Sequence, residues 1–373
     1  MAAKPRKCIS LGMKQFDKRI KNEAYVPVHK GSYSIFDPCL VIDGKQMRFL
    51  GNPEFKDDFN KSHFKFLGRW IHSSLNEQII KDKVRSEFLE DMKTVSESRV
   101  RGFKKLWLYQ FYVLARYSWP FMIHDFDLSY AKDLDRLVIP MLKKWSGVGR
   151  SVETGLLFRS RQLFGLGLTA VSDHFQSMQL VKCQLLQTSG DDSIRALYSS
   201  VKSRETKGRK WRPSRVLTAV DSEVDLMIHF PVQEGRAGIG HGNFNPNPSK
   251  SQRRKLAAKV IKDFADEKRV AHAHSLARQG VWLQWSNSTI PFDFSWKNLL
   301  FGPGEHILKF VLNASVNWVK TPDLLKLWGY KHQDLCTICG SSGCTLHHIL
   351  SNCSIALRQR RYNWRHDSVL KHI

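Results

Sequence analysis

Residues 336–353 read CTICGSSGCTLHHILSNC, and this stretch decides how the C-terminal part of the chain folds. It holds four of the seven cysteines in the 373-residue sequence, together with two histidines. Two residues separate Cys336 from Cys339, and this spacing lets both thiolates reach one ion. His348 and Cys353 are separated by four residues, close to one helical turn, so both side chains can point the same way. The pattern C-x2-C-x8-H-x4-C therefore predicts a small domain folded around one tetrahedral Zn²⁺ ion.

The ligand set within this stretch has two alternatives. His347 is adjacent to His348 and would change the spacing to seven and five intervening residues. Cys344 lies between the two pairs and could replace one of the ligands. A reduced, metal-free cysteine cluster is the competing interpretation. Four protein ligands leave no open position for water, so the zinc is expected to be structural and not catalytic. The favoured ligands are Cys336, Cys339, His348 and Cys353.

The charge of the chain is strongly positive. Lysine and arginine number 59 against 34 aspartates and glutamates, which gives a net charge of +25 at pH 7. An excess of this size favours polyanionic partners such as nucleic acid. No run of about 18 apolar residues is present to span a bilayer, and the N-terminus has no apolar signal segment. The isolated cysteines fit a reducing compartment. We therefore expect a nuclear or cytoplasmic protein that is not secreted and has no membrane partner.

The distribution of apolar residues predicts a mainly α-helical chain with a small β portion. Short β-type runs occur before residue 80, around Asp43-Gly44 and in KSHFKFLGRWI (residues 61–71). Apolar residues then recur at helical spacing, beginning with Val84 and Phe88. A basic connector, KSRETKGRKWRPSR (residues 202–215), precedes a further helical region. The expected divisions are residues 1–80, 81–200, 201–330 and 331–373.

Several helix boundaries follow from capping and breaking residues. The second helix is expected to end near Trp119, which Pro120 restricts. Ser129 is a candidate N-cap for the third helix, and Pro140 is expected to kink it or end it early. A later helix is expected over residues 255–280, closed by Gly280. Its predicted buried face is Leu256, Val260, Ile261 and Phe264.

The sequence SGDD (residues 189–192) resembles the metal-binding hairpin of template-directed polymerases, but its flanks do not fit that structure. Both flanks have helical spacing, whereas a two-metal site needs a strand, a turn and a second strand. We interpret the stretch as a junction between two helices, with Ser189 or Asp191 as N-cap. Asp57-Asp58 lies in a polar loop and is equally unconvincing as a catalytic pair. No catalytic residue is therefore assigned.

Cations and aromatic residues alternate in ESRVRGFKKLWLYQFYVLARYSWPF (residues 97–121). Phe103, Trp107 and Phe111 are spaced for one buried face, so we assign the rings to packing and the cations to phosphate contacts. The basic connector carries seven cations against one acid and should also attract polyanions. The candidate nucleic-acid-binding residues are Arg99, Arg101, Lys104, Lys105, Arg116, Arg209, Lys210, Arg212, Arg360, Arg361 and Arg365.

Four motifs in this order resemble the C-terminal part of reverse transcriptases from non-LTR retrotransposons, of the type that carries a restriction-like endonuclease. KPRKCISL (residues 4–11) is similar to the segment that follows the catalytic aspartates of the palm, and FKFLGRWI (residues 64–71) to the palm–thumb junction. LWLYQFYVLARYSWPF followed by LKKWSGV resembles the helical thumb. The Cys/His stretch followed by RYNWRHDSVL (residues 361–370) resembles the zinc knuckle and is the most specific match.

The resemblance implies residual palm strands, a helical thumb, a helical linker and a CCHC zinc knuckle before an endonuclease domain. The palm aspartates and the endonuclease are expected to be missing, so the chain resembles a fragment or degenerate copy of a retroelement polyprotein. It would bind an RNA template and a DNA target, and would be inactive alone as an RNA-directed DNA polymerase. Mg²⁺ would enter only if a palm were supplied. The alternative is a host-recruited zinc-binding adaptor that contacts protein partners.

Overall fold

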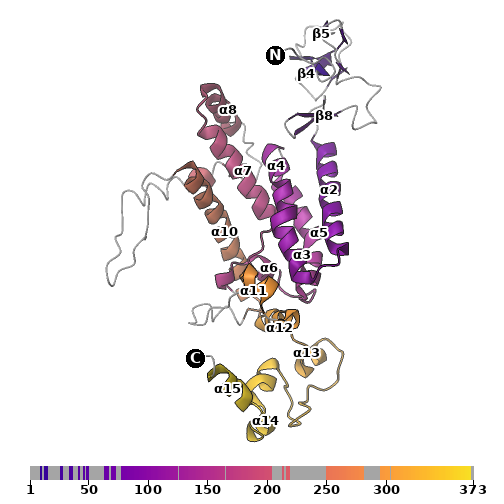
Figure 1. Ribbon diagram of the computed structural model, residues 1–373, viewed down its shortest axis with the longest axis vertical. Coiled ribbons are helices and arrows are strands. Elements are labelled where there is room, and N and C mark those ends of the chain that lie inside the picture. The colour runs from indigo at the N-terminus through magenta and orange to yellow at the C-terminus, as the bar shows by residue number, and fades with distance from the viewer. Residues whose placement is uncertain are drawn as a thin grey trace, which may run out of the picture. The chain divides into compact units, whose positions relative to one another are not determined.

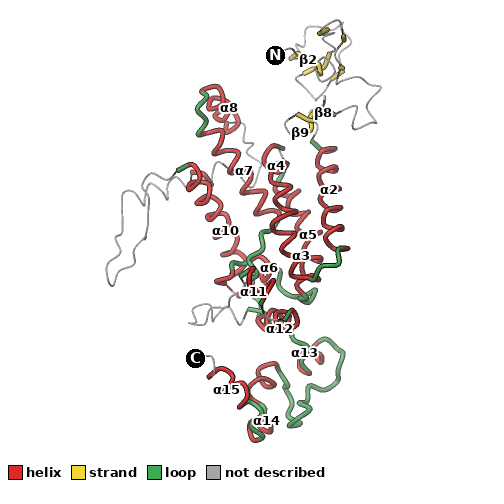
Figure 2. The backbone as a smooth tube through the Cα atoms, in the orientation of Figure 1, coloured by secondary structure: helices red, strands yellow, loops and turns green. Residues whose placement is uncertain are grey.

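The computed structural model describes residues 77–203, 212–218, 249–280 and 295–370, with gaps at 125, 164, 214–215 and 303, and the backbone of short strands between residues 9 and 72. Within these residues the protein is mainly helical, as the sequence predicts (Figure 1). Short loops join the helices from α2 (Gln78–Glu97) to α8 (Asp192–Ser203), whereas a longer loop leads from α13 (Pro322–Leu327) to η6 (His348–Asn352) (Figure 2). None of the helices described is both long enough and apolar enough to cross a membrane.

The helices are numbered as in Figure 1. The first group is α2 (Gln78–Glu97), α3 (Gly102–Leu108), the π-helix η3 (Tyr109–Val113), α4 (Leu114–Ile123), α5 (Leu128–Ser146), α6 (Gly155–Phe158), the 3₁₀-helix η4 (Arg161–Leu163), α7 (Val171–Gln187) and α8 (Asp192–Ser203). The second group is α10 (Lys250–His274), α11 (Trp296–Phe301), α12 (Glu305–Ser315), α13 (Pro322–Leu327), the π-helix η6 (His348–Asn352), α14 (Ser354–Arg358) and α15 (Asn363–Leu370).

The strands form four small sheets. They are β1 (Ile9–Ser10), β2 (Gly12–Gln15), β3 (Val26–Pro27), β4 (Tyr33–Phe36), β5 (Val41–Ile42), β6 (Lys45–Gln46), β7 (Arg48–Phe49), β8 (His63–Phe66) and β9 (Arg69–His72). β1 pairs with β7 in parallel, whereas β2–β4–β3, β5–β6 and β8–β9 are antiparallel. Only their backbone is described, so the expected β portion with palm strands stays a prediction.

The chain divides into two compact units, each built from separate stretches of sequence. Unit 1 comprises Met1–Thr94, Val113–Leu134 and His174–Pro246. Unit 2 comprises Val95–Tyr112, Asp135–Asp173 and Asn247–Ile373. The four divisions expected along the sequence stay a prediction.

Aromatic rings fill the core of unit 1. Phe88 of α2 meets Tyr117 of α4 edge-on, with ring centroids 4.9 Å apart, and Phe121 meets Phe175 of α7 at 5.8 Å. The Tyr117 hydroxyl donates to Asp91 Oδ2 at 2.8 Å, and burial with this carboxylate raises the pKa of Tyr117. The helical periodicity of α2 and α4 thus brings Phe88, Tyr117 and Phe121 into a shared core.

The helix expected to end near Trp119 continues through Pro120 to Ile123. The side-chain amide of Gln179 donates to the carbonyl oxygens of Phe121 at 2.5 Å and His124 at 3.2 Å, which fastens the end of α4. Pro120 removes only one backbone hydrogen bond. Buried rings on both sides of Pro120 and the two bonds from Gln179 outweigh that loss, which is why the predicted boundary was wrong.

A charged core distinguishes unit 2. Glu153 and Arg159 are each 2% exposed and form an ion pair at 2.9 Å. Glu153 also accepts hydrogen bonds from the backbone N–H groups of Gly155 at 2.6 Å and Leu156 at 3.1 Å, so it caps α6. Desolvation lowers the pKa of Arg159, although Glu153 opposes this shift. The backbone of α6 satisfies the carboxylate of this buried pair, whereas Nε of Arg159 has no hydrogen-bond partner among the described residues.

The helix predicted around Leu134 is longer than expected. α5 begins at Leu128, so Ser129 lies within the helix and is not its N-cap, and Pro140 does not end it. Leu134, Val138, Leu142 and Trp145 are buried at helical spacing, whereas Pro140 is exposed. Burial of this apolar stripe keeps the helix intact past the proline. The chain turns at Gly147, whose positive φ of 70° favours glycine.

The inward face of α10 differs from the predicted apolar face. The helix runs from Lys250 to His274 and is capped by a reciprocal Ser249–Gln252 capping box. Phe264 is 58% exposed, whereas Asp266 is 4% exposed. Asp266 accepts a hydrogen bond from the backbone N–H of Ser160 at 3.1 Å. Ile261 is 6% exposed, as predicted, so the buried face combines apolar and polar residues and the predicted face is partly wrong.

The SGDD stretch is a junction between two helices. The Asp191 carboxylate accepts a hydrogen bond from the backbone N–H of Ser193 at 2.8 Å, in the first turn of α8. Asp191 is exposed and lies outside any metal-binding cluster in the described residues. The predicted N-cap is confirmed.

Candidate metal centre

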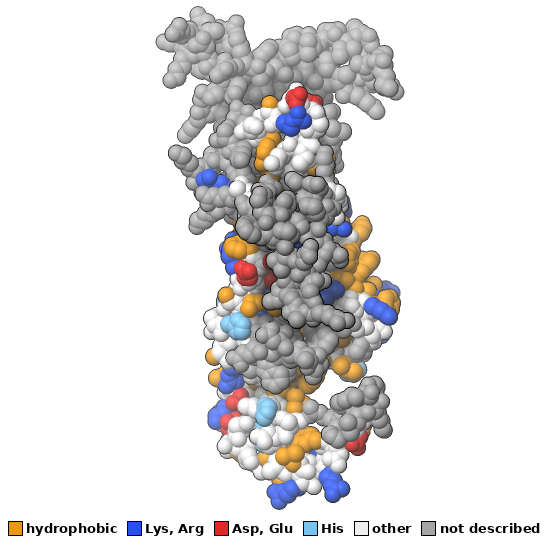
Figure 3. Space-filling view, turned by 90° about the vertical axis from the view of Figure 1, so that its left-hand side faces the viewer, with side chains coloured by type: hydrophobic (Ala, Val, Ile, Leu, Met, Phe, Trp, Pro, Cys, Tyr) orange, Lys and Arg blue, Asp and Glu red, His pale blue; other side chains and the backbone are white. Residues whose placement is uncertain are grey.

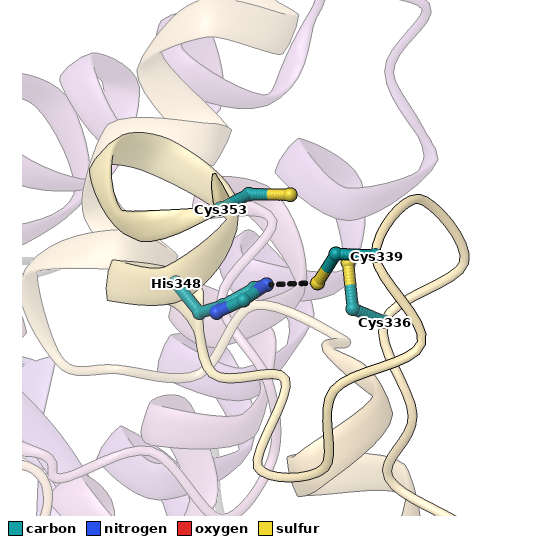
Figure 4. A group of neighbouring side chains, drawn as sticks. All are labelled: Cys336, Cys339, His348 and Cys353. Atoms are coloured by element: carbon teal, nitrogen blue, oxygen red, sulfur yellow. Dashed lines mark hydrogen bonds between the residues drawn. The ribbon is translucent and has the colours of Figure 1, made fainter. Parts of the chain in front are cut away.

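Four side chains converge in the C-terminal part of unit 2. The ligand atoms of Cys336, Cys339, His348 and Cys353 all lie within 4.8 Å of one another (Figure 4). His348 Nε2 is 3.4 Å from Cys339 Sγ. Bond lengths of about 2.3 Å to sulfur and 2.0 Å to nitrogen give a tetrahedral sulfur–nitrogen edge of roughly 3.5 Å. The four side chains could therefore hold one tetrahedral metal ion, and the ligand type suits Zn²⁺.

The first ligand pair lies on a tight loop. The carbonyl of Cys336 accepts a hydrogen bond from the backbone N–H of Gly340 at 2.9 Å, and the N–H of Cys336 donates to the carbonyl of Ser341 at 2.9 Å. Gly340 has a φ of 71°, a backbone conformation that side chains disfavour. This closed turn directs both thiols of the C-x2-C pair to the same side, as Figure 4 shows.

The second ligand pair lies at the two ends of η6. His348 begins this π-helical segment, and Cys353 follows its last residue. A π-helix forms hydrogen bonds between residues five apart, which brings His348 and Cys353 to the same side. Thr345 fixes the start, since its hydroxyl accepts a hydrogen bond from the backbone N–H of His348 at 3.2 Å. The H-x4-C spacing is therefore matched by the local helix type.

The structure brings together the favoured ligand set and not the alternatives. His347 is exposed and lies outside the cluster, whereas His348 is half-buried and contacts Cys339. Cys344 is 2% exposed and also lies outside the four-residue set. Its thiol interacts with the sulfur of Cys336, and burial raises the pKa of Cys344 to about 11. Cys344 is therefore a buried neighbour of the four-residue set and not a member of it.

Two of the thiols are set up for deprotonation, which metal binding requires. Backbone N–H groups of Cys339 and Ile338 lower the pKa of Cys336 to about 7. The hydroxyl and backbone of Ser341 lower the pKa of Cys339, whose sulfur lies 3.3 Å from Ser341 Oγ. Dipoles of the loop thus favour thiolate on the first ligand pair.

Contacts outside the ligand set hold the site together. The N–H of Cys344 donates to the carbonyl of Asp334 at 2.9 Å, and the Asp334 carboxylate lies 3.2 Å from Lys326 Nζ. The Tyr362 hydroxyl donates to the carbonyl of Ile349 at 3.0 Å, which ties the segment after α14 to η6. Since four protein ligands fill a tetrahedron, the arrangement suits a structural ion with no open position.

Two of the cations that were predicted to contact phosphate already have partners within the protein. Lys105 Nζ donates to the carbonyl of Ser96 at 2.5 Å, and Arg116 pairs with Asp91 at 2.7 Å. Both cations therefore have structural partners within the protein.

The other predicted nucleic-acid-binding cations differ in how exposed their side chains are. Arg212 is half-buried. Arg209, Lys210 and the side chain of Arg365 lie outside the described residues. The exposed candidates are Arg99, Arg101, Lys104, Arg360 and Arg361. Arg116 is exposed as well, but it is paired with Asp91, so these five are the exposed candidates without an acidic partner among the salt bridges of the described residues.

The predicted packing of the aromatic rings is partly wrong. Phe103 is 3% exposed as expected, but Trp107 is 40% and Phe111 is 49% exposed. Leu106, Tyr109 and Val113 are buried instead. The buried residues follow one another at steps of three and four, so the buried face is rotated away from the face that carries Trp107 and Phe111. No simple sequence signal marks this change.

Two parts of the site were missed by sequence reasoning. Ser341 supports the sulfur of Cys339, and its position two residues after a ligand is the only local signal. Asp334 braces the loop through Lys326, eight residues away, and only the fold reveals that pairing. Both contacts act on the loop that carries the first ligand pair.

Comparison of the chain with protein-family models found no matching family, and comparison with curated proteins found no match. The site is therefore interpreted from its own geometry. Asp57-Asp58 lies outside the described residues, within which the Cys/His cluster is the only group of three or more His, Cys, Asp or Glu side chains that could hold a metal ion.

Proposed function

We propose that this chain is a nucleic-acid-binding protein in which a zinc-stabilised C-terminal module presents cations to phosphates. The observation that carries the proposal is the Cys₃His cluster, followed within one short segment by exposed Arg358, Arg360 and Arg361. The net charge of +25 supplies the attraction for a polyanion. Lysine and arginine side chains are interspersed with hydrophobic ones on the face in Figure 3.

The arginines are well placed for phosphate contacts. Arg360 follows α14 with a positive φ of 56°, and the Nε of Arg361 donates to the side chain of Gln359 at 2.7 Å. Neither is paired with an acid among the salt bridges of the described residues. A guanidinium with remaining donors can bind phosphate in a bidentate manner. Loss of the metal would remove the scaffold that holds this segment.

We further propose that this binding belongs to a retrotransposon reverse transcriptase of the non-LTR class. The support is the order of the thumb-like and knuckle-like motifs, together with the mainly helical fold. In that setting the partners are an RNA template and a DNA target. Mg²⁺-dependent polymerisation would require palm aspartates, which are not among the described residues.

The test is a titration of the zinc-loaded chain with RNA and DNA duplexes at several salt concentrations. We expect log affinity to fall linearly with log salt, and R360A/R361A to make the slope shallower by roughly one to two. K268A is the matched control, because Lys268 is exposed but lies over the Phe264 ring at 4.0 Å. Affinity that is unchanged by salt, or by R360A/R361A, would contradict the proposal.

An adaptor that contacts protein partners is the second candidate. Exposed apolar side chains near the metal centre favour it, since Tyr330 is 78%, Trp364 is 77% and Leu327 is 60% exposed. Pull-down with and without nuclease separates the two functions. Partners that remain after nuclease treatment support the adaptor, and partners that are lost support nucleic-acid binding.

A further inference from the structure

Three aromatic side chains form a surface cluster in unit 2 that the metal centre does not use. The rings of Trp107 and Phe111 lie with centroids 5.5 Å apart, and Phe111 meets Trp296 of α11 at 5.5 Å. Trp107 is 40% and Phe111 is 49% exposed, and Trp296 is half-buried. Large rings of this kind dominate protein cores and interfaces, so a group of them at the surface needs an explanation.

The helix backbone holds these rings outward. Tyr109, two residues before Phe111, is fully buried, and its hydroxyl donates to the carbonyl of Thr169 at 2.8 Å. The Gln110 amide both donates to Thr169 Oγ1 at 2.9 Å and accepts from the Thr169 backbone N–H at 2.8 Å. These three bonds fix the rotation of η3. Phe111 is therefore exposed by a well-anchored backbone and not by fraying.

Cations accompany the rings. Lys104, Trp107 and Phe111 are spaced by three and four residues, which places them on one helix face. Lys104 is exposed, and so is Lys297, next to Trp296. The guanidinium of Arg161 lies 5.4 Å from the centre of the Trp296 ring. Flat apolar surfaces and positive charges are thus combined within one patch.

We propose that Trp107, Phe111 and Trp296 form a stacking platform for the bases of single-stranded nucleic acid, with Lys104, Lys297 and Arg161 contacting its phosphates. This inference rests on the proposed nucleic-acid-binding function. It adds that the ligand is single-stranded and names the residues that would distinguish a single strand from a duplex. Exposed rings beside a cationic track bind unpaired bases with little sequence preference. Bases stacked inside a duplex cannot reach the rings, so a duplex would contact only the cations.

The positive charge around the three rings favours single-stranded nucleic acid over a protein as the binding partner. Lys104 and Lys297 are not paired with acids in the described salt bridges, so a polyanion gains contacts without displacing an internal partner. An apolar protein partner would cover the rings but leave these cations buried and unpaired, which is costly. Protein binding is accordingly an outcome of the test and not a second proposal.

The experiment measures binding of the full chain, zinc-loaded, to a labelled twenty-nucleotide poly-dT strand, an abasic strand of equal length, and a duplex. Wild type should prefer the strand with bases over the abasic strand by about 10- to 100-fold, given the usual strength of base–aromatic stacking. W107A/F111A should abolish this preference and leave duplex binding and its salt dependence unchanged. W107F, which keeps a ring, should retain most of the preference.

F264A is the matched control, because Phe264 is an exposed ring of unit 2 outside the patch. It should leave the preference for bases unchanged. The inference is overturned if W107A/F111A binds all three ligands as wild type does, or if its only change is in self-association or protein capture. Absence of binding to every ligand, at low salt, would overturn the proposed function as well.

Discussion

Arg159 shows how a single buried residue can connect separate stretches of unit 2. Its side chain is 2% exposed and is paired with Glu153, which also caps α6. Ser160, the next residue, donates its backbone N–H to Asp266 on α10. Arg269 then links Asp266 to Asp173 at 3.5 and 2.6 Å. Charges from three separate stretches of sequence thus meet in one buried network.

Removing one charge from this network should be costly. R159M leaves the Glu153 carboxylate buried without its cation, and we expect it to lower the free energy of unfolding by about 3–5 kcal/mol. The double variant E153Q/R159M should lose less than the sum of the two single variants, because no charge is then left unpaired. Equilibrium urea unfolding of the zinc-loaded protein measures these differences.

R278M is the control for the loss of an arginine as such. Arg278 is 44% exposed and pairs with Asp323 at 3.0 Å, and an exposed pair of this kind contributes about 1 kcal/mol or less. If R159M were no more destabilised than R278M, the buried pair would not have the role assigned to it.

Asp135 is a second residue whose position follows from the fold. Its carboxylate accepts hydrogen bonds from the backbone N–H groups of Val171 at 2.7 Å and Ser172 at 3.1 Å, at the start of α7. Burial raises the pKa of Asp135 to about 6, although these bonds lower it. A distant carboxylate therefore caps α7, where no Ser, Thr, Asp or Asn is available at the preceding position.

At the scale of elements, prolines inside two helices show that tertiary packing outweighs local preference. α5 passes through Pro140 on its exposed side, while its apolar stripe is buried. A proline in a helix interior normally costs about 3 kcal/mol relative to alanine. The helix forms because the buried stripe compensates for that cost.

Replacing the proline should stabilise α5. P140A restores a backbone N–H and removes the clash of the ring with the preceding turn, so we expect the free energy of unfolding to rise by about 1–3 kcal/mol. K144A, at an exposed position of the same helix, should change it by less than about 0.5 kcal/mol. Urea midpoints of the two variants provide the comparison, and a P140A protein less stable than wild type would show that the proline shapes the packing of α5.

The helices were predictable where one apolar stripe faces one core. Val84, Phe88 and Met92 follow that rule, and α2 contains them as predicted. Phe264 does not, because α10 buries Asp266 against the backbone of Ser160, and no local pattern shows that partner. The π-helix η3 likewise depends on Gln110 and Thr169, which are 59 residues apart in sequence.

The metal centre was more predictable than the helix faces around it. Its four ligands lie within one short stretch, so their spacing nearly determines their geometry. The structure was needed to choose His348 over His347, because the spacing of either histidine from Cys353 is close to one helical turn. The aromatic surface cluster was not predictable, since Trp296 joins Phe111 only in the folded chain.

At the scale of the whole molecule, a basic protein of 373 residues carries its soft ligands in one module and its exposed aromatic cluster on another part of unit 2. The Cys/His cluster precedes the segment that bears Arg360 and Arg361, and Tyr362 ties that segment to η6. The aromatic cluster is anchored by its own hydrogen bonds and does not depend on the ligands. The two features therefore predict separable effects on binding, one electrostatic and one dependent on bases.

The most direct test of the central claim is the zinc content of the purified, folded chain, measured by elemental analysis. We expect one Zn²⁺ ion per chain, lost in C336S and C353S and retained in C344S and H347A. Circular dichroism of each variant confirms that the helical part remains folded. A folded wild-type protein without zinc, or a C353S variant that retains the ion, would contradict the account.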